Sequence, residues 1–233
     1  MIYNQYNQPI GESLPAFKGA EAPKAISMAG RFCRLEKLDP ERHAKALFEV
    51  LCDPQHEANW TYLPYGPFDQ FAAFYELIEQ QSNMLDPLFF SIIDNQTNSA
   101  VGITSYLRIE PNTGVIEVGN IHFSAQLQKT PHATEVMFLM MQYVFDTLGY
   151  RRYEWKCDDL NGPSKSAAER LGFCFEGIFK QATVYKNRNR DTAWFAITDK
   201  QWPNIKQGFV NWLAPANFDQ LQHQRKPLQA FRS

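Results

Sequence analysis

The sequence predicts an α/β (α+β) fold, with a central mixed, mostly antiparallel sheet of about seven strands flanked by helices. Three observations predict it. Segments with apolar residues at strand spacing recur along the chain, helical segments with clear start and stop signals lie between them, and turn residues separate consecutive strands. The 233 residues suit one domain at 30–199, an N-terminal extension packed on it at 1–29, and a C-terminal extension at 200–233.

The first half of the domain is expected to supply a strand, two helices and a run of three antiparallel strands. Asp39 and Pro40 give the first helix an N-cap and an N1 proline. In chain order, the expected elements are a strand at 30–38, a helix at 39–51, a loop at 56–67, a helix at 69–81, and strands at 88–93, 100–109 and 115–123.

The second half is expected to alternate helices and strands before it ends in a hairpin. Asn161 can cap the shorter helix, and Gly172 suits the left-handed position that ends it. The expected elements are a helix at 131–148, a strand at 152–157, a helix at 162–171, and strands at 175–185 and 191–197 around a turn at 186–190. The chain beyond Asp199 is expected to be helical or irregular.

Composition excludes several classes of function. The net charge of −2 provides no basic surface for nucleic acid, and 44% hydrophobic with 21% charged residues is ordinary for a globular protein. The four cysteines are widely spaced and no histidine stands at metal-finger spacing, so we expect reduced thiols and no metal. The N-terminus shows neither a signal peptide nor a membrane span, and a cytoplasmic location is expected.

Two helix starts carry the strongest motifs. Asn161-Gly162-Pro163-Ser164 is followed, eight residues later, by Gly172-Phe173, and the segment Gln128–Thr134 leads into the longer helix. The helix start at Gln128–Thr134 presents free amides and the positive end of the helix dipole, which together bind phosphate. Any capped helix has such amides, so the motif alone leaves a purely structural role open.

Together these segments resemble the GNAT N-acyltransferase superfamily over roughly residues 30–197. The N-x-x-S to G-F segment is similar to one of its motifs, and Gln128 and Ala133 match the ends of its Q/R-x-x-G-x-G/A pyrophosphate loop. Pro131 departs from that loop because it stands where the family has glycine and cannot donate an amide. The chain looks closest to the ribosomal-protein alanine acetyltransferase type, through Glu117-Val118-Gly119 and Ala133-Thr134-Glu135.

The resemblance implies that acetyl-CoA binds in a splay between the fourth and fifth strands. The backbone of His122 and Phe123 would pair with the pantetheine arm, and Asn161 would approach that arm or its bound water. The pyrophosphate would rest on the loop and helix start, which comprise Gln128, Lys129, Thr130, His132, Ala133 and Thr134. His132 is equally well explained as a solvent-facing histidine.

The chemistry of acetyl transfer suggests two further roles. A free alkylamine has a pKa near ~10, so a base must take a proton before the nitrogen attacks, and Glu117 is the candidate. The family's helix tyrosine is missing here, which leaves Ser164 as the candidate proton donor to the leaving thiolate. Trp60, Tyr62 and Tyr65 fall in the loop that walls the acceptor pocket in this family, although ordinary packing explains them equally well.

The sequence therefore predicts an acetyl-CoA-dependent N-acetyltransferase that moves acetyl to a primary amine of a small or amino-acid-like acceptor by direct attack. Two alternatives remain open: acetylation of a protein N-terminus, and a non-catalytic GNAT-like module that binds CoA. The oligomeric state is also open, with a homodimer among the alternatives.

Overall fold

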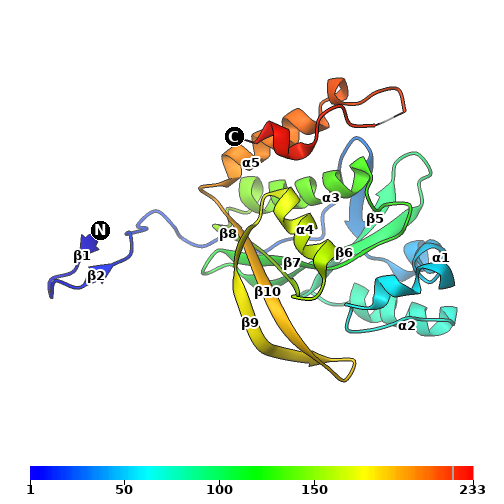
Figure 1. Cartoon of the computed structure of the whole chain (residues 1–233). Coiled ribbons are helices and arrows are strands. Elements are labelled where there is room, and N and C mark those ends of the chain that lie inside the picture. Colours follow the sequence, from blue (N-terminus) through cyan, green and yellow to red (C-terminus); the bar gives the residue numbers. More distant parts are fainter. Residues whose placement is uncertain (222, 233) are drawn as a thin grey trace.

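An eight-stranded sheet in the order β3-β4-β5-β6-β7-β8-β10-β9 organises the chain (Figure 1). The computed structural model describes residues 1–221 and 223–232. The strands are β3 (Met28–Ala29), β4 (Cys33–Lys37), β5 (Leu88–Asp94), β6 (Ala100–Glu110), β7 (Val115–Phe123), β8 (Arg152–Asp158), β9 (Cys174–Tyr185) and β10 (Arg188–Thr198). β7 and β8 pair in parallel and the other neighbours are antiparallel, which confirms the expected mixed sheet.

Helices cover both faces of the sheet and form two apolar clusters with it (Figure 1). The helices are α1 (Pro40–Leu51), α2 (Phe71–Ser82), α3 (Pro131–Gln142), α4 (Gly162–Leu171) and α5 (Trp202–Leu213). α3, α4 and α5 bury their apolar stripes in the larger cluster, whereas α1 and α2 pack in the smaller one. Burial of these stripes supplies most of the helices' stability, because short isolated helices are marginal in water.

The expected helix signals act as their residue types suggest. The Asp39 side chain accepts a hydrogen bond from the Arg42 amide, and the Asn161 side chain accepts one from the Ser164 amide. Gly172 ends α4 with a φ of 105°, in the left-handed region that glycine enters without steric cost. These local contacts mark where each helix begins or ends.

Several expected boundaries were wrong. The hairpin turn is not 186–190 but the pair Lys186-Asn187, whose φ angles of 47° and 57° are those of a tight turn between twisted strands. Residues Pro54–Trp60 form a 3₁₀ helix where a loop was expected, with Asp53 capping its start. α3 ends at Gln142 and continues as a π-helical turn, Tyr143–Thr147. The short β3 brings the sheet to eight strands.

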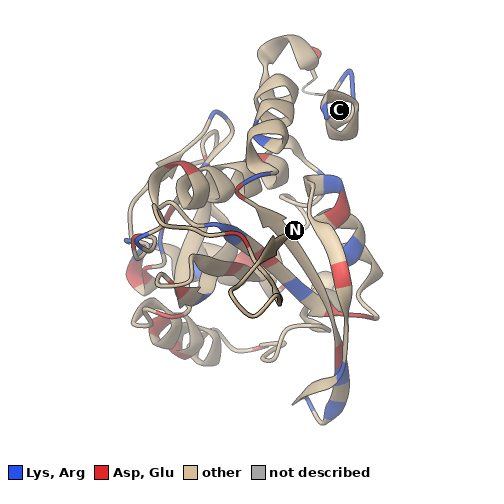
Figure 2. Ribbon diagram, turned by 90° about the vertical axis from the view of Figure 1, so that its left-hand side faces the viewer, with Lys and Arg blue, Asp and Glu red and all other residues tan. Residues whose placement is uncertain are grey.

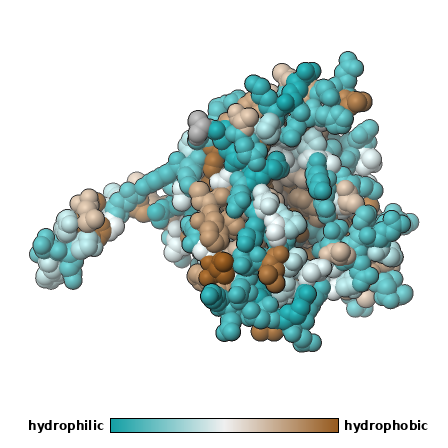
Figure 3. All heavy atoms as spheres, in the orientation of Figure 1, coloured by the Kyte–Doolittle hydropathy of each residue, from teal (hydrophilic) through white to brown (hydrophobic). Residues whose placement is uncertain are grey.

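The two ends of the chain differ in how they meet the domain. The amides of Ala20 and Glu21 donate to carbonyls of Pro111 and Leu148, so the N-terminal segment lies on the domain there. Before that point, the small hairpin of β1 (Ile2–Tyr3) and β2 (Pro9–Ile10) projects away from the body (Figures 1 and 3). At the other end, α5 packs along α3, and Phe138 stacks on Phe209.

Candidate active site

The parallel strands β7 and β8 separate part of the way along their length. They pair from Val115 opposite Arg152 to Val118 opposite Trp155, and no further. β7 nevertheless continues to Phe123 and β8 to Asp158. Beyond Val118 the facing edges of the two strands are therefore unpaired with each other, which confirms the expected splay.

A β-bulge lies at the same point of β7. Ser105 of β6 pairs with Gly119 and Ile103 pairs with His122, so two residues of β7 stand opposite the single residue between them. Asn120 is the first of the two and has a φ of 50°. Its side-chain NH₂ group donates to the Ser105 hydroxyl at 2.9 Å. The Tyr65 hydroxyl donates to the side-chain Oδ1 atom of Asn120 at 3.4 Å. The splay thus opens beside a polar cluster that the sequence analysis missed, although asparagine's tolerance of positive φ was a signal for it.

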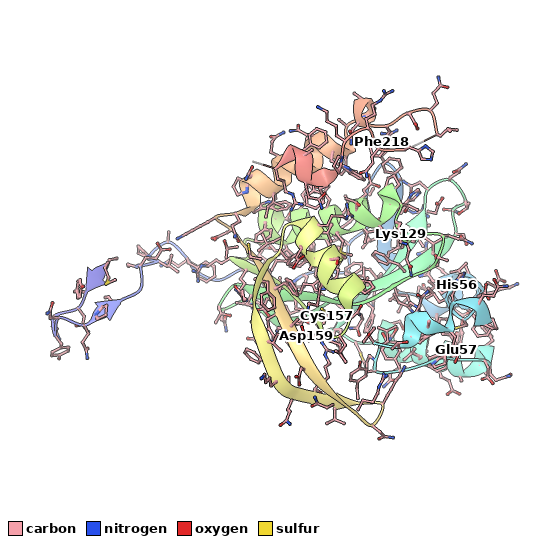
Figure 4. The ribbon with its side chains drawn as sticks, in the orientation of Figure 1. His56, Glu57, Lys129, Cys157, Asp159 and Phe218 are labelled. Carbon is pink, nitrogen blue, oxygen red and sulfur yellow. The ribbon has the colours of Figure 1, made fainter. Side chains whose placement is uncertain are left out.

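The segment before α3 has the form of an anion-binding helix start. Lys129 has a φ of 61°, and no side chain caps the first turn of α3, because the Thr130 hydroxyl donates to Leu127 O at 2.7 Å. The Gln128 side chain donates to Phe123 O at 2.9 Å, which ties the loop to the end of β7. Figure 4 shows Lys129 near this end of α3. The amides of the first turn remain available to an anion.

Other side chains of this turn make structural contacts. His132 Nε2 lies 3.2 Å from Asp94 Oδ2, and the buried Thr134 hydroxyl accepts from Arg170 at 2.6 Å. The carboxylate of Glu135 accepts backbone hydrogen bonds from Arg31, Phe32 and Cys33 at 2.7–3.0 Å. The glutamate of the Ala-Thr-Glu motif therefore anchors the turn between β3 and β4.

Asn161 and Ser164 lie at the start of α4, beside the end of β8. Because Asn161 Oδ1 accepts from the Ser164 amide at 3.2 Å, the NH₂ group of Asn161 remains free to donate. The Ser164 hydroxyl accepts from the Trp155 indole at 3.0 Å and so keeps its own proton for donation. In Figure 4 the neighbouring Cys157 and Asp159 lie at the foot of α4.

Glu117 is part of a buried ionic network on the opposite face of the sheet from α4. Its carboxylate is 3% exposed and lies 2.6 Å from Arg108 Nη1 and 2.9 Å from Lys156 Nζ. Lys156 also contacts Glu154 at 2.7 Å and lies 3.7 Å from the centre of the Trp194 ring. Burial raises the pKa of Glu117 above its ordinary value, against the opposing effect of the two cations.

His122 and Trp60 pack against each other at the far end of β7. Their rings meet edge to face with centroids 4.1 Å apart, and the Trp60 indole donates to Leu51 O at 3.0 Å. Trp60 is 2% exposed, so its ring packs against His122 from within the core. Burial lowers the pKa of His122 to about 4, which keeps the imidazole neutral at pH 7. Its side chain is buried, so it could meet a ligand only through its backbone, as could its half-buried neighbour Phe123.

The segment that carries Trp60, Tyr62 and Tyr65 meets the β9–β10 hairpin across the splay. The Tyr62 hydroxyl donates to Leu160 O at 3.1 Å, which links the loop to the end of β8. Tyr185, at the end of β9, donates to Asp158 Oδ2 at 2.8 Å. The Lys186 ammonium next to it donates to Trp60 O at 2.7 Å. Tyr65 is the third aromatic expected here, and burial raises its pKa to about 12.

A pocket of about 470 Å³ lies where the hairpin and the loop meet. Its lining consists of Glu57, Ala58, Trp60, Thr61, Pro67, Lys186 and Arg188. Figure 4 shows Glu57 on the segment next to α1. Within residues 1–221 and 223–232, no group of three histidine, cysteine or acidic side chains is placed to hold a metal ion, and no helix is long and apolar enough to cross a membrane.

The sequence analysis missed most of this polar face. Glu154, Lys156 and Asp158, the charged residues that alternate along β8, are largely buried and face the site. The signal was the regular two-residue spacing of charges in a strand whose other face is apolar. Arg108 and Tyr185 carried no comparable signal, because only the tertiary fold brings them to this face.

Comparisons with known proteins agree with this geometry. Residues 33–174 match the family model of the acetyltransferase (GNAT) domain. A GCN5-related N-acetyltransferase from Brucella melitensis is 46% identical with a TM-score of 0.92, over 94% of this chain and 99% of that one. A structure described as a probable acetyltransferase (GNAT family) from Chromobacterium violaceum ATCC 12472 is 36% identical with a TM-score of 0.78, over 84% and 98%.

A curated relative extends the comparison. The N-acetyltransferase p20 of Bacillus licheniformis, itself uncharacterized, is 24% identical over 168 residues, which cover 72% of this chain and 93% of p20. The region that matches the family model, 33–174, contains the splay, the start of α3 and all of α4. The chain belongs to the GNAT acetyltransferase family.

Proposed function

We propose that this acetyltransferase uses acetyl-CoA and transfers the acetyl group to a primary amine by direct attack. The amine nitrogen forms a bond to the thioester carbon, the C–S bond breaks, and CoA leaves as a thiolate that takes up a proton. The observation that carries the proposal is the end of β7–β8 pairing at Val118 and Trp155, directly at the bulge of β7. An extended, amide-bearing pantetheine arm is suited to two strand edges that no longer pair with each other.

The start of α3 supports a site for the pyrophosphate. Backbone amides of the loop and first turn, from Gln128 to Thr134, would meet the phosphates together with the helix dipole. Lys129 is the cation of this segment. His132 is already paired with Asp94, so we assign it a supporting role. Pro131 contributes no amide, and its neighbours must supply the contact.

Asn161 would donate its free NH₂ group to the pantetheine or to a water bound there, while its oxygen caps α4. The carbonyl of the thioester would then lie near the bulge at Asn120. Holding the two reactants in this geometry supplies a large part of the rate acceleration, because a bimolecular reaction becomes effectively unimolecular.

Glu117 is the proposed base, acting directly or through water. Its raised pKa suits proton abstraction better than that of an exposed carboxylate, because the ideal pKa of a base lies near the working pH. Arg108 and Lys156 hold its position. On the other side of the thioester, Ser164 would donate its free hydroxyl proton to the leaving thiolate.

Release of free thiol from acetyl-CoA, measured with a panel of amines and short peptides, tests the function. Glu117→Gln should lower kcat by roughly 100-fold or more, and Ser164→Ala should lower kcat with little change in the Kd of CoA. Glu110→Gln is the matched control, because Glu110 is an exposed carboxylate of β6. Turnover of peptides alone would identify an N-terminal protein acetyltransferase. CoA binding without release from any acceptor would contradict the proposal and identify a binding module.

A further inference from the structure

The tip of the β9–β10 hairpin carries three cations. Lys186, Arg188 and Arg190 follow one another at every second position, and Figure 2 shows the basic residues gathered at this tip. None of the three forms a salt bridge with a carboxylate within residues 1–221 and 223–232. The Nε atom of Arg190 is buried with no hydrogen-bond partner among those residues. Lys186 and Arg190 are half-buried and Arg188 is exposed, and cations gathered without a carboxylate partner attract an anion.

Two of these cations line the pocket of about 470 Å³. Lys186 Nζ donates to Trp60 O at 2.7 Å, and Arg188 Nη2 donates to Thr61 O at 2.6 Å. Both partners are neutral carbonyls. Burial, and secondarily the nearby Arg188, lower the pKa of Lys186. Glu57 is the lining carboxylate, so the described lining has an excess of positive charge.

The pocket lies beside the far ends of β7 and β8, beyond the point where the two strands separate. Tyr185, adjacent to Lys186, is hydrogen-bonded to Asp158 at the end of β8. Trp60, which accepts from Lys186, packs on His122 near the end of β7. The hairpin tip therefore contacts, directly or through one residue, the divergent ends of both strands. An acceptor held in this pocket can present its amine to the thioester between them.

We infer that the acceptor of this enzyme carries an oxyanion, a carboxylate or a phosphate, which Lys186 and Arg188 bind at the end remote from the reacting amine. The inference rests on the proposed function. An oxyanion accepts charge-assisted hydrogen bonds from both side chains, and these are stronger than their present bonds to carbonyls. The guanidinium of Arg188 can bind such a group with two parallel hydrogen bonds. An acceptor with a second cation in place of the oxyanion would be repelled.

The test compares amines that differ only in the remote anion. Glycine, β-alanine and longer ω-amino acids are each paired with the alkylamine of equal length, and O-phosphoethanolamine with ethanolamine. We expect kcat/KM to be at least roughly tenfold higher for the anionic member of the best pair, the effect of one charge-assisted hydrogen bond. The length of the best pair reports the distance from pocket to thioester, and the carboxylate and phosphate arms distinguish the two anions.

Substitutions at the tip of the β9–β10 hairpin test whether Lys186 and Arg188 cause the preference for anionic acceptors. Lys186→Gln and Arg188→Gln should raise the KM of the anionic acceptor roughly tenfold each, with kcat and the Kd of CoA little changed. Lys180→Gln is the matched control, since it removes an exposed cation from β9 outside the pocket lining. Arg188→Glu should reverse the preference toward a diamine of the same length.

The outcomes separate this inference from the proposed function. Turnover of neutral amines at rates equal to their anionic partners would leave the acetyltransferase proposal standing and overturn the inference. An anion preference that survives both substitutions would also overturn it. No thiol release from any amine would remove the proposed function and the inference with it. Far-UV circular dichroism and thermal unfolding of each variant establish that it is folded.

Discussion

The Lys156 ammonium lies 2.9 Å from the Oε2 atom of Glu117, just before β7 and β8 separate. Glu117 stands directly opposite Glu154 in the parallel register, so two carboxylates meet across adjacent strands. Like charges at such positions repel each other, and the cation between them offsets the repulsion. The same contact holds the proposed base, Glu117, in place.

Lys156→Met should destabilise the protein by about 1–3 kcal/mol, because two buried carboxylates lose their shared cation and keep only Arg108 and Arg152 as partners. Urea unfolding at pH 7 measures the change. In a Glu154→Gln background the same substitution should cost less, since one of the two repelling charges is already gone. Equal costs in both backgrounds would show that Lys156 stabilises the fold by packing on Trp194 and not by separating charges.

His122 should make stability depend on pH. Its pKa of about 4 in the folded protein lies below the ordinary 6.5, so the unfolded chain binds a proton that the folded chain does not between these values. The free energy of unfolding should therefore fall as pH decreases from 6.5 to 4, by on the order of 3 kcal/mol from this group. Urea unfolding across this range should show a shallower decline for His122→Gln. His43 titrates in both the parent protein and the variant, and burial lowers its pKa as well. An identical slope of unfolding free energy against pH would therefore show that His122 is not the source of the decline.

Glu135→Ala should destabilise the protein by roughly 3 kcal/mol, because three backbone amides between Arg31 and Cys33 lose their charged acceptor. Thermal or urea unfolding measures the loss. The control is Glu49→Ala, which removes an exposed glutamate from α1 and should change stability by less than about 0.5 kcal/mol. A matching small effect at Glu135 would contradict the anchoring role.

Pro131→Ala tests the assignment of the phosphate site. The substitution adds an amide at the first position of α3, and one additional hydrogen bond of about 0.5–1.5 kcal/mol should tighten CoA binding by roughly two- to tenfold. Isothermal titration with CoA measures this. Pantetheine lacks the pyrophosphate, so its affinity should not change. Equal tightening of both ligands would place the added amide away from the phosphates.

Local signals predicted much of the fold. Asp39, Asn161 and Gly172 each act within a few residues of their own position, so helix starts and stops can be recognised along the chain. Boundaries that depend on partners were less predictable. β10 begins at Arg188, three residues after the tyrosine that ends β9, because pairing with β9 draws charged residues into the strand.

The candidate site divides in the same way. Gln128, Asn161 and Ser164 belong to short motifs that can be recognised along the chain, and the structure places them in the loop before α3 and at the start of α4. Lys156 and Tyr185 belong to no such motif. Their roles follow from contacts with Glu117 and Asp158, residues that are distant in sequence.

The sequence by itself determined the family, the order of elements and the two helix starts proposed to hold CoA, because caps, turns and apolar periodicity are properties of neighbouring residues. The tertiary structure alone decided which charges are buried and which cations line the pocket at the hairpin tip. Burial and long-range pairing depend on the assembly of the whole sheet. That assembly brings the hairpin tip at Lys186 into contact with Trp60 at the end of the 3₁₀ helix. No local pattern encodes a contact between residues so far apart in the chain.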